Sequence, residues 1–324
     1  MILGRGADSG ATGRKRSLMV SFPMLDSVSD FSRLKSRALS RTRARKDKLR
    51  GCARILKIPK REVYIPMDPT YYDMIFKRKS FHRYGEPDGK KITPEELDDI
   101  SRMWYEFKPL FDGIKTKIKI VPGEQTSCNR GEEYCILIYS EKKPGYLQNI
   151  GYIGEQLDLC LTARGIGPLW FGVGRTKERR YEGLEYVIMM AIRKIDDDSK
   201  FRTPGDLSTF KRVPVEEFWE GDVIDGITDV VRLTPTACNI QPWKVVNKGG
   251  GTLDVYRYRR PGKHGIIPPF RLAYFGSIDI GIFMLFLDLC LEHKGIDFER
   301  ELTPDNGNFK QLNLNAVYKL KALG

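Results

Sequence analysis

The segment NIGYIGEQLDLCLTARGI (149–166) returns 130 residues later as DIGIFMLFLDLCLEHKGI (279–296). Nine of the 18 positions are identical, including the block Leu-Asp-Leu-Cys-Leu and the closing Gly-Ile pair. Both copies have helical spacing and end in glycine, a residue that closes helices in the left-handed conformation. Because each copy is apolar on most sides, the sequence predicts two central buried helices, one in each half of an internally duplicated fold.

Shorter elements surround the two helices. At the same offset, DDISRM (98–103) aligns with TDVVRL (228–233), which predicts a short helix in each half. β-Branched or alternating patterns predict strands at EYCILIYS (133–140), EYVIMMAIRKI (185–195) and TLDVYRY (252–258), the last preceded by WKVV and the hairpin turn NKGGG (247–251). Helices and strands mix without a steady βαβ alternation, so we expect an α+β fold with halves at 67–220 and 221–324, packed about a pseudo-two-fold axis.

Composition indicates a soluble globular protein of 324 residues with 41% apolar residues. The longest apolar run, IGIFMLFLDLCL (280–291), is about half a membrane span and contains Asp288, so it predicts a buried helix and no membrane partner. The six cysteines form no C-x-x-C pair and there are three histidines, so the sequence predicts no metal site and a reducing, cytoplasmic location. Cys160 and Cys290, inside apolar helical runs, are expected to be core residues.

The formal charge of +13 is concentrated at one end of the chain. Residues 1–61 hold 17 Lys and Arg against four Asp, so the remainder is neutral. We expect residues 1–66 to be a basic, disordered extension. Three explanations stay open: a translation start assigned too early, with the true one near Met67; a basic arm for nucleic acid or anionic surfaces; or an organellar transit peptide.

Motifs for side-chain catalysis are missing from the sequence. There is no G-x-S-x-G, P-loop or H-E-x-x-H pattern, which favours an enzyme whose cofactor carries the chemistry, or no enzyme at all. The stretch FKRKSFHRY (76–84) follows the short helical segment YYDMI and offers cations with a serine hydroxyl, a suitable donor set for phosphate. The alternative interpretation is an ordinary solvated basic face.

The loop PTACNIQPW (235–243) is more specific. Its prolines stiffen the backbone, its small residues at 236–238 let a flat ligand approach, and Asn239 and Gln241 supply donors and acceptors. An ordered connection between helix and strand is the alternative. Trp243 is expected to pack in the core rather than to stack on a ligand.

Four stretches resemble motifs of the nitroreductase family: RKSFHRY (78–84), GIGPLWFG (165–172), KRVPVEEF (211–218) and PTACNIQPW (235–243). In that family the second motif is a turn after the central helix. The resemblance implies an α+β fold and an obligate dimer that binds FMN between its subunits. Here the basic motif lies in the first half and the loop in the second, so the chain resembles the single-chain pseudo-dimers of the family and is expected to be a monomer.

The resemblance also implies roles for individual residues. The ribityl phosphate and nearby polar atoms would be met by Arg78, Lys79, Ser80, Lys211 and Arg212. The flavin ring would be lined by Pro235, Thr236, Ala237, Asn239 and Gln241 from the second half, and by the backbone of Trp170, Phe171 and Gly172 along its edge. The family usually has Arg or Lys where this chain has His82, so the cation near the flavin would come from Arg83 or be absent.

A second flavin site is not expected. At the offset of 130, the loop of the second half aligns with WYEFKPLFDG (104–113), which has no Asn, Gln or small residues at the required places. The second half would carry its copy of the basic motif upstream of Asp229, but the sequence there, PVEEFWEGDV (214–223), is acidic. The sequence therefore predicts one FMN per chain.

The expected activity is a ping-pong oxidoreductase. NAD(P)H would reduce FMN, and a nitroaromatic, a quinone or another small acceptor would reoxidise it. A non-catalytic FMN-binding protein is one alternative. The other is a nucleic-acid-associated protein that acts through its basic arm.

Overall fold

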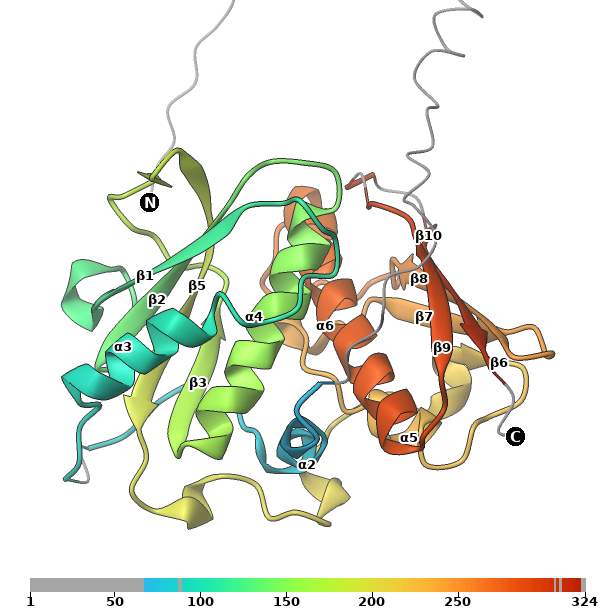
Figure 1. Cartoon of the computed structure of the whole chain (residues 1–324), viewed down its shortest axis with the longest axis horizontal. Coiled ribbons are helices and arrows are strands. Elements are labelled where there is room, and N and C mark those ends of the chain that lie inside the picture. The colour runs from blue at the N-terminus through green and yellow to red at the C-terminus, as the bar shows by residue number, and fades with distance from the viewer. Residues whose placement is uncertain (1–66, 87–88, 306, 309–310, 322–324) are drawn as a thin grey trace, which may run out of the picture. The chain divides into compact units, whose positions relative to one another are not determined.

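The computed structural model describes residues 67–324 except 87–88, 306, 309–310 and 322–324. The basic extension predicted at 1–66, and every expectation attached to it, lies outside the described residues. Two helices cross at the centre of the described part and a β-sheet lies on either side of them (Figure 1). These helices are α4 (Tyr146–Ala163) and α6 (Leu272–His293), which contain the two copies of the repeat.

Glycines set the crossing of α4 and α6. A Cβ atom at Gly151 would lie 2.0 Å from the carbonyl oxygen of Ile278, and one at Gly281 would lie 2.0 Å from that of Gln148. Both residues of the first contact map onto those of the second at the offset of 130. The repeat in the sequence is therefore a pseudo-two-fold in the structure, and the two backbones touch where only glycine fits.

α6 is long and apolar enough to cross a bilayer, but 94% of its most apolar window is buried inside the protein. The prediction of a buried core helix is confirmed. Cys160 and Cys290 are buried on the two helices, also as predicted.

The first sheet has the strand order β1-β2-β5-β3, with β4 attached to β5, and every pairing is antiparallel. Its strands are β1 (Thr116–Pro122), β2 (Tyr134–Ser140), β3 (Ile166–Phe171), β4 (Arg180–Tyr181) and β5 (Leu184–Lys194). The same half contains α2 (Thr70–Lys77) and α3 (Pro94–Met103). Thr93 and Glu96 form a capping box that starts α3.

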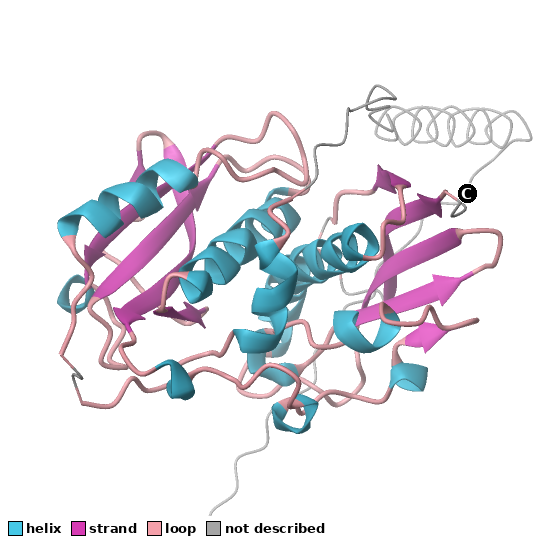
Figure 2. Ribbon diagram, turned by 60° about the horizontal axis from the view of Figure 1, so that its bottom comes forward, coloured by secondary structure: helices cyan, strands magenta, loops and turns pink. Residues whose placement is uncertain are grey.

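The second sheet has the order β6-β7-β8-β10-β9, and only the short β6–β7 pair is parallel. Its strands are β6 (Trp219–Glu220), β7 (Trp243–Asn247), β8 (Thr252–Tyr258), β9 (Phe298–Leu302) and β10 (Leu312–Leu320). Besides α6, this half contains the short helix α5 (Thr228–Val231). Figure 2 shows the two sheets separated by the helices.

Single 3-10 turns complete the described chain: η1 (Gly123–Gln125), η2 (Asp198–Lys200), η3 (Leu207–Thr209), η4 (Val215–Glu217), η5 (Ala237–Asn239) and η6 (Pro269–Arg271). The long segment from β5 to β6 passes from the first sheet to the second and includes η2, η3 and η4. It carries the predicted residues Lys211 and Arg212 toward the second half.

The α+β class and the predicted strands are confirmed, with one correction. The stretch GIGPLWFG, expected as a turn, is mostly strand β3: Gly165 has φ of +68°, and Ile166–Phe171 then pair with β5. The boundary at 220/221 stays a prediction. However, β6 precedes that boundary and pairs with β7 of the second sheet.

Candidate functional site

Several arginines lie close together where the segment between β5 and β6 reaches the second half. Arg202 and Arg212 both lie against the ring of Phe210, with their guanidinium carbons 4.2 and 5.9 Å from its centroid. Neither arginine has a carboxylate partner among the described residues. Burial and the charge of Arg78 lower the pKa of Arg202 to about 10. Burial and then Arg78, Arg202 and Arg232 lower the pKa of Arg212 to about 10. Burial and neighbouring cations thus disfavour the charged form of both arginines, and an anion placed beside them would favour it.

Arg212 links the segment between β5 and β6 to the loop at 235–241, which is predicted to line the flavin. Its Nη1 donates to Oδ1 of Asn239 at 2.9 Å, and Nε and Nη2 donate to the carbonyl of Leu233. Asn239 Nδ2 in turn donates to the carbonyl of Lys211 at 2.8 Å. Two stretches that the sequence placed in one site are therefore in direct contact.

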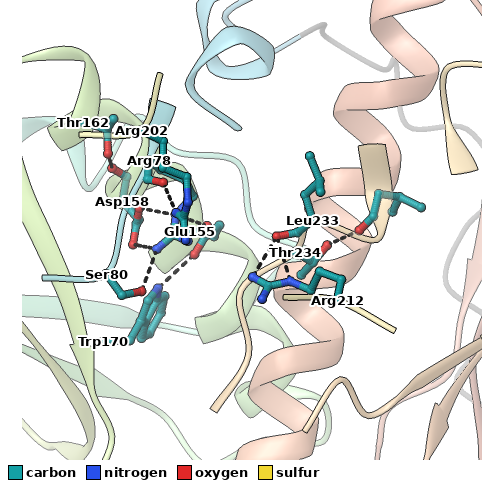
Figure 3. Close-up of polar contacts among 11 residues, drawn as sticks. Arg78, Ser80, Glu155, Asp158, Thr162, Trp170, Arg202, Arg212, Leu233 and Thr234 are labelled. Carbon is teal, nitrogen blue, oxygen red and sulfur yellow. Dashed lines mark hydrogen bonds and ion pairs between the residues drawn. The ribbon is translucent and has the colours of Figure 1, made fainter. Parts of the chain in front are cut away.

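Arg78 has a different partner from the predicted phosphate. Its Nε and Nη2 donate to the two carboxylate oxygens of Asp158 at 2.9 and 3.0 Å, and Glu155 Oε1 lies 3.3 Å from Nε (Figure 3). The side chain is 2% exposed. Burial lowers the pKa of Arg78, but Asp158 and Glu155 outweigh it and raise the pKa above its ordinary value. In the structure Arg78 therefore forms a buried ion pair, and its role at the phosphate stays a prediction.

The rest of the basic motif is more open. Arg78 Nη2 lies 3.4 Å from Ser80 Oγ, which is half-buried, so the ion pair also orients this hydroxyl. Lys79 is exposed and donates to the carbonyl of Lys200 at 2.8 Å. His82 and its neighbour Arg83 are both exposed.

A buried carboxyl lies beneath the strand predicted to follow the flavin edge. Trp170 Nε1 donates to Glu155 Oε2 at 2.9 Å, and the indole covers Gly154, where a Cβ would lie 2.4 Å from the ring. Glu155 is fully buried, and burial, Asp158 and Asp279 together raise its pKa well above the ordinary value. No described residue donates a hydrogen bond to its Oε1. Phe171 is buried, and Gly172 faces Phe275 of α6.

The loop from the second half is held by Asp279 of α6. The carboxylate accepts from Thr236 Oγ1 at 2.8 Å and from the Ala237 amide at 3.2 Å. Burial raises the pKa of Asp279 to about 7, against the effect of these hydrogen bonds. Gln241 Oε1 accepts the amide of Val213 at 2.9 Å, so this side chain braces the loop.

The loop has an unusual backbone. Cys238, Asn239 and Gln241 have φ values of 51°, 54° and 53°, a left-handed conformation that costs non-glycine residues energy and often marks a binding segment. Pro235 is buried beneath the loop. Trp243 is fully buried and stacks on Phe283, which confirms its predicted packing role.

The pseudo-symmetric position is closed. Asn149, the counterpart of Asp279, accepts the amides of Leu110 and Phe111 at 2.8 and 3.0 Å, and both of these side chains are buried. On α6, the carboxylate of Asp288 accepts hydrogen bonds from Tyr152 and Tyr318 and pairs with Arg300. The absence of a second cofactor site stays a prediction.

Sequence reasoning missed several members of the site. Five residues contact predicted site residues or shift their pKa, but no short motif marks them: Arg202, Arg232, Glu155, Asp158 and Asp279. Asp158 and Asp279 were visible inside the repeat, where a charged residue in an apolar helix indicates a required partner. Arg202 lies in a connecting segment without a pattern.

Comparison with known proteins identifies the family. A family described as "Putative TM nitroreductase" matches residues 70–290. A "putative nitroreductase" from Thermotoga maritima is 21% identical, with a TM-score of 0.51 over 81% of this chain and 99% of that chain. An FMN-dependent nitroreductase from Clostridium difficile is 15% identical, with a TM-score of 0.32 over 44% of this chain and 96% of that one.

A nitroreductase with bound FMN from Desulfitobacterium hafniense is 13% identical, with a TM-score of 0.32 over 46% of this chain and 100% of that one. A search of curated proteins gave no significant match. Because the family match spans more than half of the sequence, the chain belongs to this nitroreductase family.

Proposed function

We propose that the chain is an FMN-dependent oxidoreductase with one flavin site, formed between its two halves. The observation that carries this proposal is the group of arginines around Arg212. Neighbouring arginines lower the pKa of Arg212, and Arg212 contacts Asn239 of the loop predicted to line the flavin. A dianionic phosphate would relieve this repulsion, because guanidinium groups bind phosphate through paired, charge-assisted hydrogen bonds.

The surrounding donors also fit FMN. The phosphate would be held by Arg202 and Arg212. Lys211, next to Arg212 in sequence, and Arg232, whose charge acts on Arg212, would add positive charge, as would Lys79 of the basic motif. Within the described part of the chain, Arg232 Nε is buried and makes no hydrogen bond, and Asp229 Oδ1 lies 3.9 Å from it. Ser80, oriented by Arg78, would add a hydroxyl. Arg78 itself supports the site through Asp158 instead of binding phosphate.

The flat part of the cofactor would lie between β3 and the loop at 235–241. Trp170, Phe171 and Gly172 would present backbone along one edge of the ring, and Pro235, Thr236 and Ala237 would line it from the second half. The hydrogen bonds of Asp279 fix this loop before any ligand arrives, which lowers the entropy cost of binding.

FMN, when bound, supplies the redox chemistry: it accepts hydride from NAD(P)H and passes electrons to a small acceptor such as a nitroaromatic or a quinone. The protein's residues would hold the ring and exclude water from its buried edge. The side chain of His82 would lie where the family usually has a cation near the ring. His82 is exposed, so a fixed cation from this position is not expected to favour the reduced ring. We also propose that the protein is a monomer in the cytoplasm.

FMN titration into flavin-free protein tests the proposal, followed by anaerobic addition of NADH or NADPH. Saturable quenching of flavin fluorescence, lost in Arg202→Ala/Arg212→Ala and kept in the surface variant Arg102→Ala, is the expected result. Bleaching of bound flavin by the reduced nucleotide would establish the oxidoreductase. Binding without bleaching would instead indicate a flavin carrier, and absence of binding would reject the proposal.

A further inference from the structure

The connection between β1 and β2 is much longer than its counterpart. It spans residues 123–133, whereas β7 and β8 of the second half are joined by residues 248–251. A hairpin needs only a few residues, so the longer loop is an addition to the first half. No residue of this loop belongs to the proposed flavin site, and its sequence brings two chemically distinctive side chains, Cys128 and Glu132, beside Cys135 of β2.

Three potential ligand atoms converge in this loop. The Sγ atoms of Cys128 and Cys135 and a carboxylate oxygen of Glu132 all lie within 4.8 Å of one another. Both cysteines are buried and free, and Glu132 is half-buried. A carboxylate directed at two buried sulfurs has no apolar packing role, so the arrangement calls for a cation or protons to balance it.

The loop's own hydrogen bonds hold this geometry. The Cys128 amide donates to Thr126 Oγ1 at 3.0 Å, and the same hydroxyl lies 3.4 Å from Cys135 Sγ. Glu132 Oε2 accepts the amide of Arg130 at 2.7 Å. The three groups are therefore positioned before any ion binds, as a metal site requires.

Gly123 provides the space for the carboxylate. A Cβ at this position would lie 2.8 Å from Glu132 Cγ and 3.0 Å from its Oε1. Its φ lies outside the left-handed range, so the backbone does not demand glycine there. The missing side chain instead lets Glu132 fold back over the two sulfurs.

We infer that Cys128, Glu132 and Cys135 form a binding site for a thiophilic divalent cation, with Zn²⁺ as the best chemical fit. Thiolates select zinc over magnesium and calcium, and Zn²⁺ accepts mixed sulfur and carboxylate ligands in a tetrahedral site. Water or the Thr126 hydroxyl would complete the fourth position. Binding releases the two thiol protons to solvent. The sequence predicted no metal site because the Cys-x3-Glu-x2-Cys spacing matches no common motif.

The ion would stabilise the side of the molecule that carries β3. The guanidinium of Arg130, between the ligands in sequence, lies 5.5 Å from the ring of Phe171. Phe171 also belongs to the same apolar cluster as both cysteines. Zinc binding therefore ties the loop to the strand beneath the proposed flavin site, without requiring flavin itself.

Metal binding by the reduced full-length protein tests the inference. The variants are made in a Cys52→Ser/Cys238→Ser background, which removes Cys52 and the exposed Cys238. Co²⁺ serves as a spectroscopic probe through its thiolate charge-transfer absorption, and Zn²⁺ is titrated against a chromophoric chelator. We expect one ion per chain, a higher melting temperature with Zn²⁺, and no charge-transfer band in Cys128→Ser/Cys135→Ser.

Two further variants separate ligation from folding. Glu132→Gln and Gly123→Ala keep both thiols and should weaken zinc binding about 10–100-fold, the usual effect of disturbing a metal site. Cys160→Ser and Cys290→Ser, which alter buried cysteines elsewhere, should leave zinc affinity unchanged. Failure of the background protein to bind Co²⁺ or Zn²⁺, or undiminished binding after loss of Cys128 and Cys135, would overturn the inference. Both outcomes are independent of FMN binding.

Discussion

Substitution of Gly281 by alanine should separate the two central helices. The added Cβ would lie 2.0 Å from the backbone oxygen of Gln148, whereas ordinary contacts begin at 3.4 Å. The helices must therefore part by about 1.4 Å at their crossing, since neither backbone can rotate away. Overpacking of this kind costs about 1–3 kcal/mol or more. Alanine's better helix propensity returns about 1 kcal/mol. Because the added atom meets backbone rather than a side chain, we expect the upper end of this range and a net loss of about 2 kcal/mol.

The pseudo-two-fold makes this prediction sharper. Gly151→Ala places a Cβ 2.0 Å from Ile278 O, so it should destabilise the protein by a similar amount. Gly276→Ala is the matched control on α6, because its nearest neighbour is a side-chain carbon of Arg257 at 3.1 Å rather than a backbone atom at 2.0 Å. Thermal and urea unfolding of the full chain measure all three. Equal stability of Gly281→Ala and Gly276→Ala would refute the proposed close crossing.

The remaining predictions concern the site. Arg212→Ala should weaken FMN binding about 10–150-fold, because a charge-assisted hydrogen bond contributes about 1.5–3 kcal/mol; unchanged affinity in a fluorescence titration would exclude Arg212 as a phosphate ligand. Asp158→Asn removes the carboxylate that pairs with Arg78 through both oxygens and leaves Glu155 as its remaining acidic partner, so it should cost up to about 3–5 kcal/mol in urea unfolding; a loss below 1 kcal/mol would contradict the buried pair. Burial raises the pKa of Asp279 to about 7 in the folded protein, so its carboxyl ionises more readily in the unfolded chain. Its contribution to stability is therefore complete below about pH 4 and is lost as the pH rises to about 7. Asp279→Asn should therefore gain stability relative to the wild type over this interval, and parallel pH profiles would disprove the shift.

The central helices could be predicted because they are repeated. Nine identities in 18 residues marked both copies. The structure adds the contact between Gly151 and Ile278 and its counterpart, which the same offset of 130 relates. The β7–β8 hairpin was equally visible, because three consecutive glycines end its turn. β3 was mistaken for a turn, since Gly165, Gly167 and Pro168 are weak strand formers and only the pairing with β5 extends them.

The site could be predicted in part. Short motifs indicated Ser80, Arg212 and Asn239, and the structure brings the last two into contact. The ion pair of Arg78 depends on which helix passes beneath it, so a local motif could not distinguish a buried partner from a phosphate. Arg202 is carried into place by an irregular segment, whose path no periodicity encodes.

One difference between the repeats did contain information about the site. Glu155 aligns with Leu285, whereas the neighbouring Asp158 aligns with Asp288. Asp288 is neutralised by Arg300 within the second half, while Glu155 and Asp158 face Arg78 near the proposed flavin. Each copy thus has one buried carboxyl without a counterpart, Glu155 in the first and Asp279 in the second, and both lie beside segments of the proposed flavin site.

The ratio of FMN to protein in the purified, FMN-saturated chain tests the central claim most directly. Flavin absorbance, measured together with the mass of the protein in solution, gives this ratio and the number of chains per particle. The account predicts one FMN per chain in a monomeric particle. Two flavins per chain, or none after incubation with excess FMN, would contradict it.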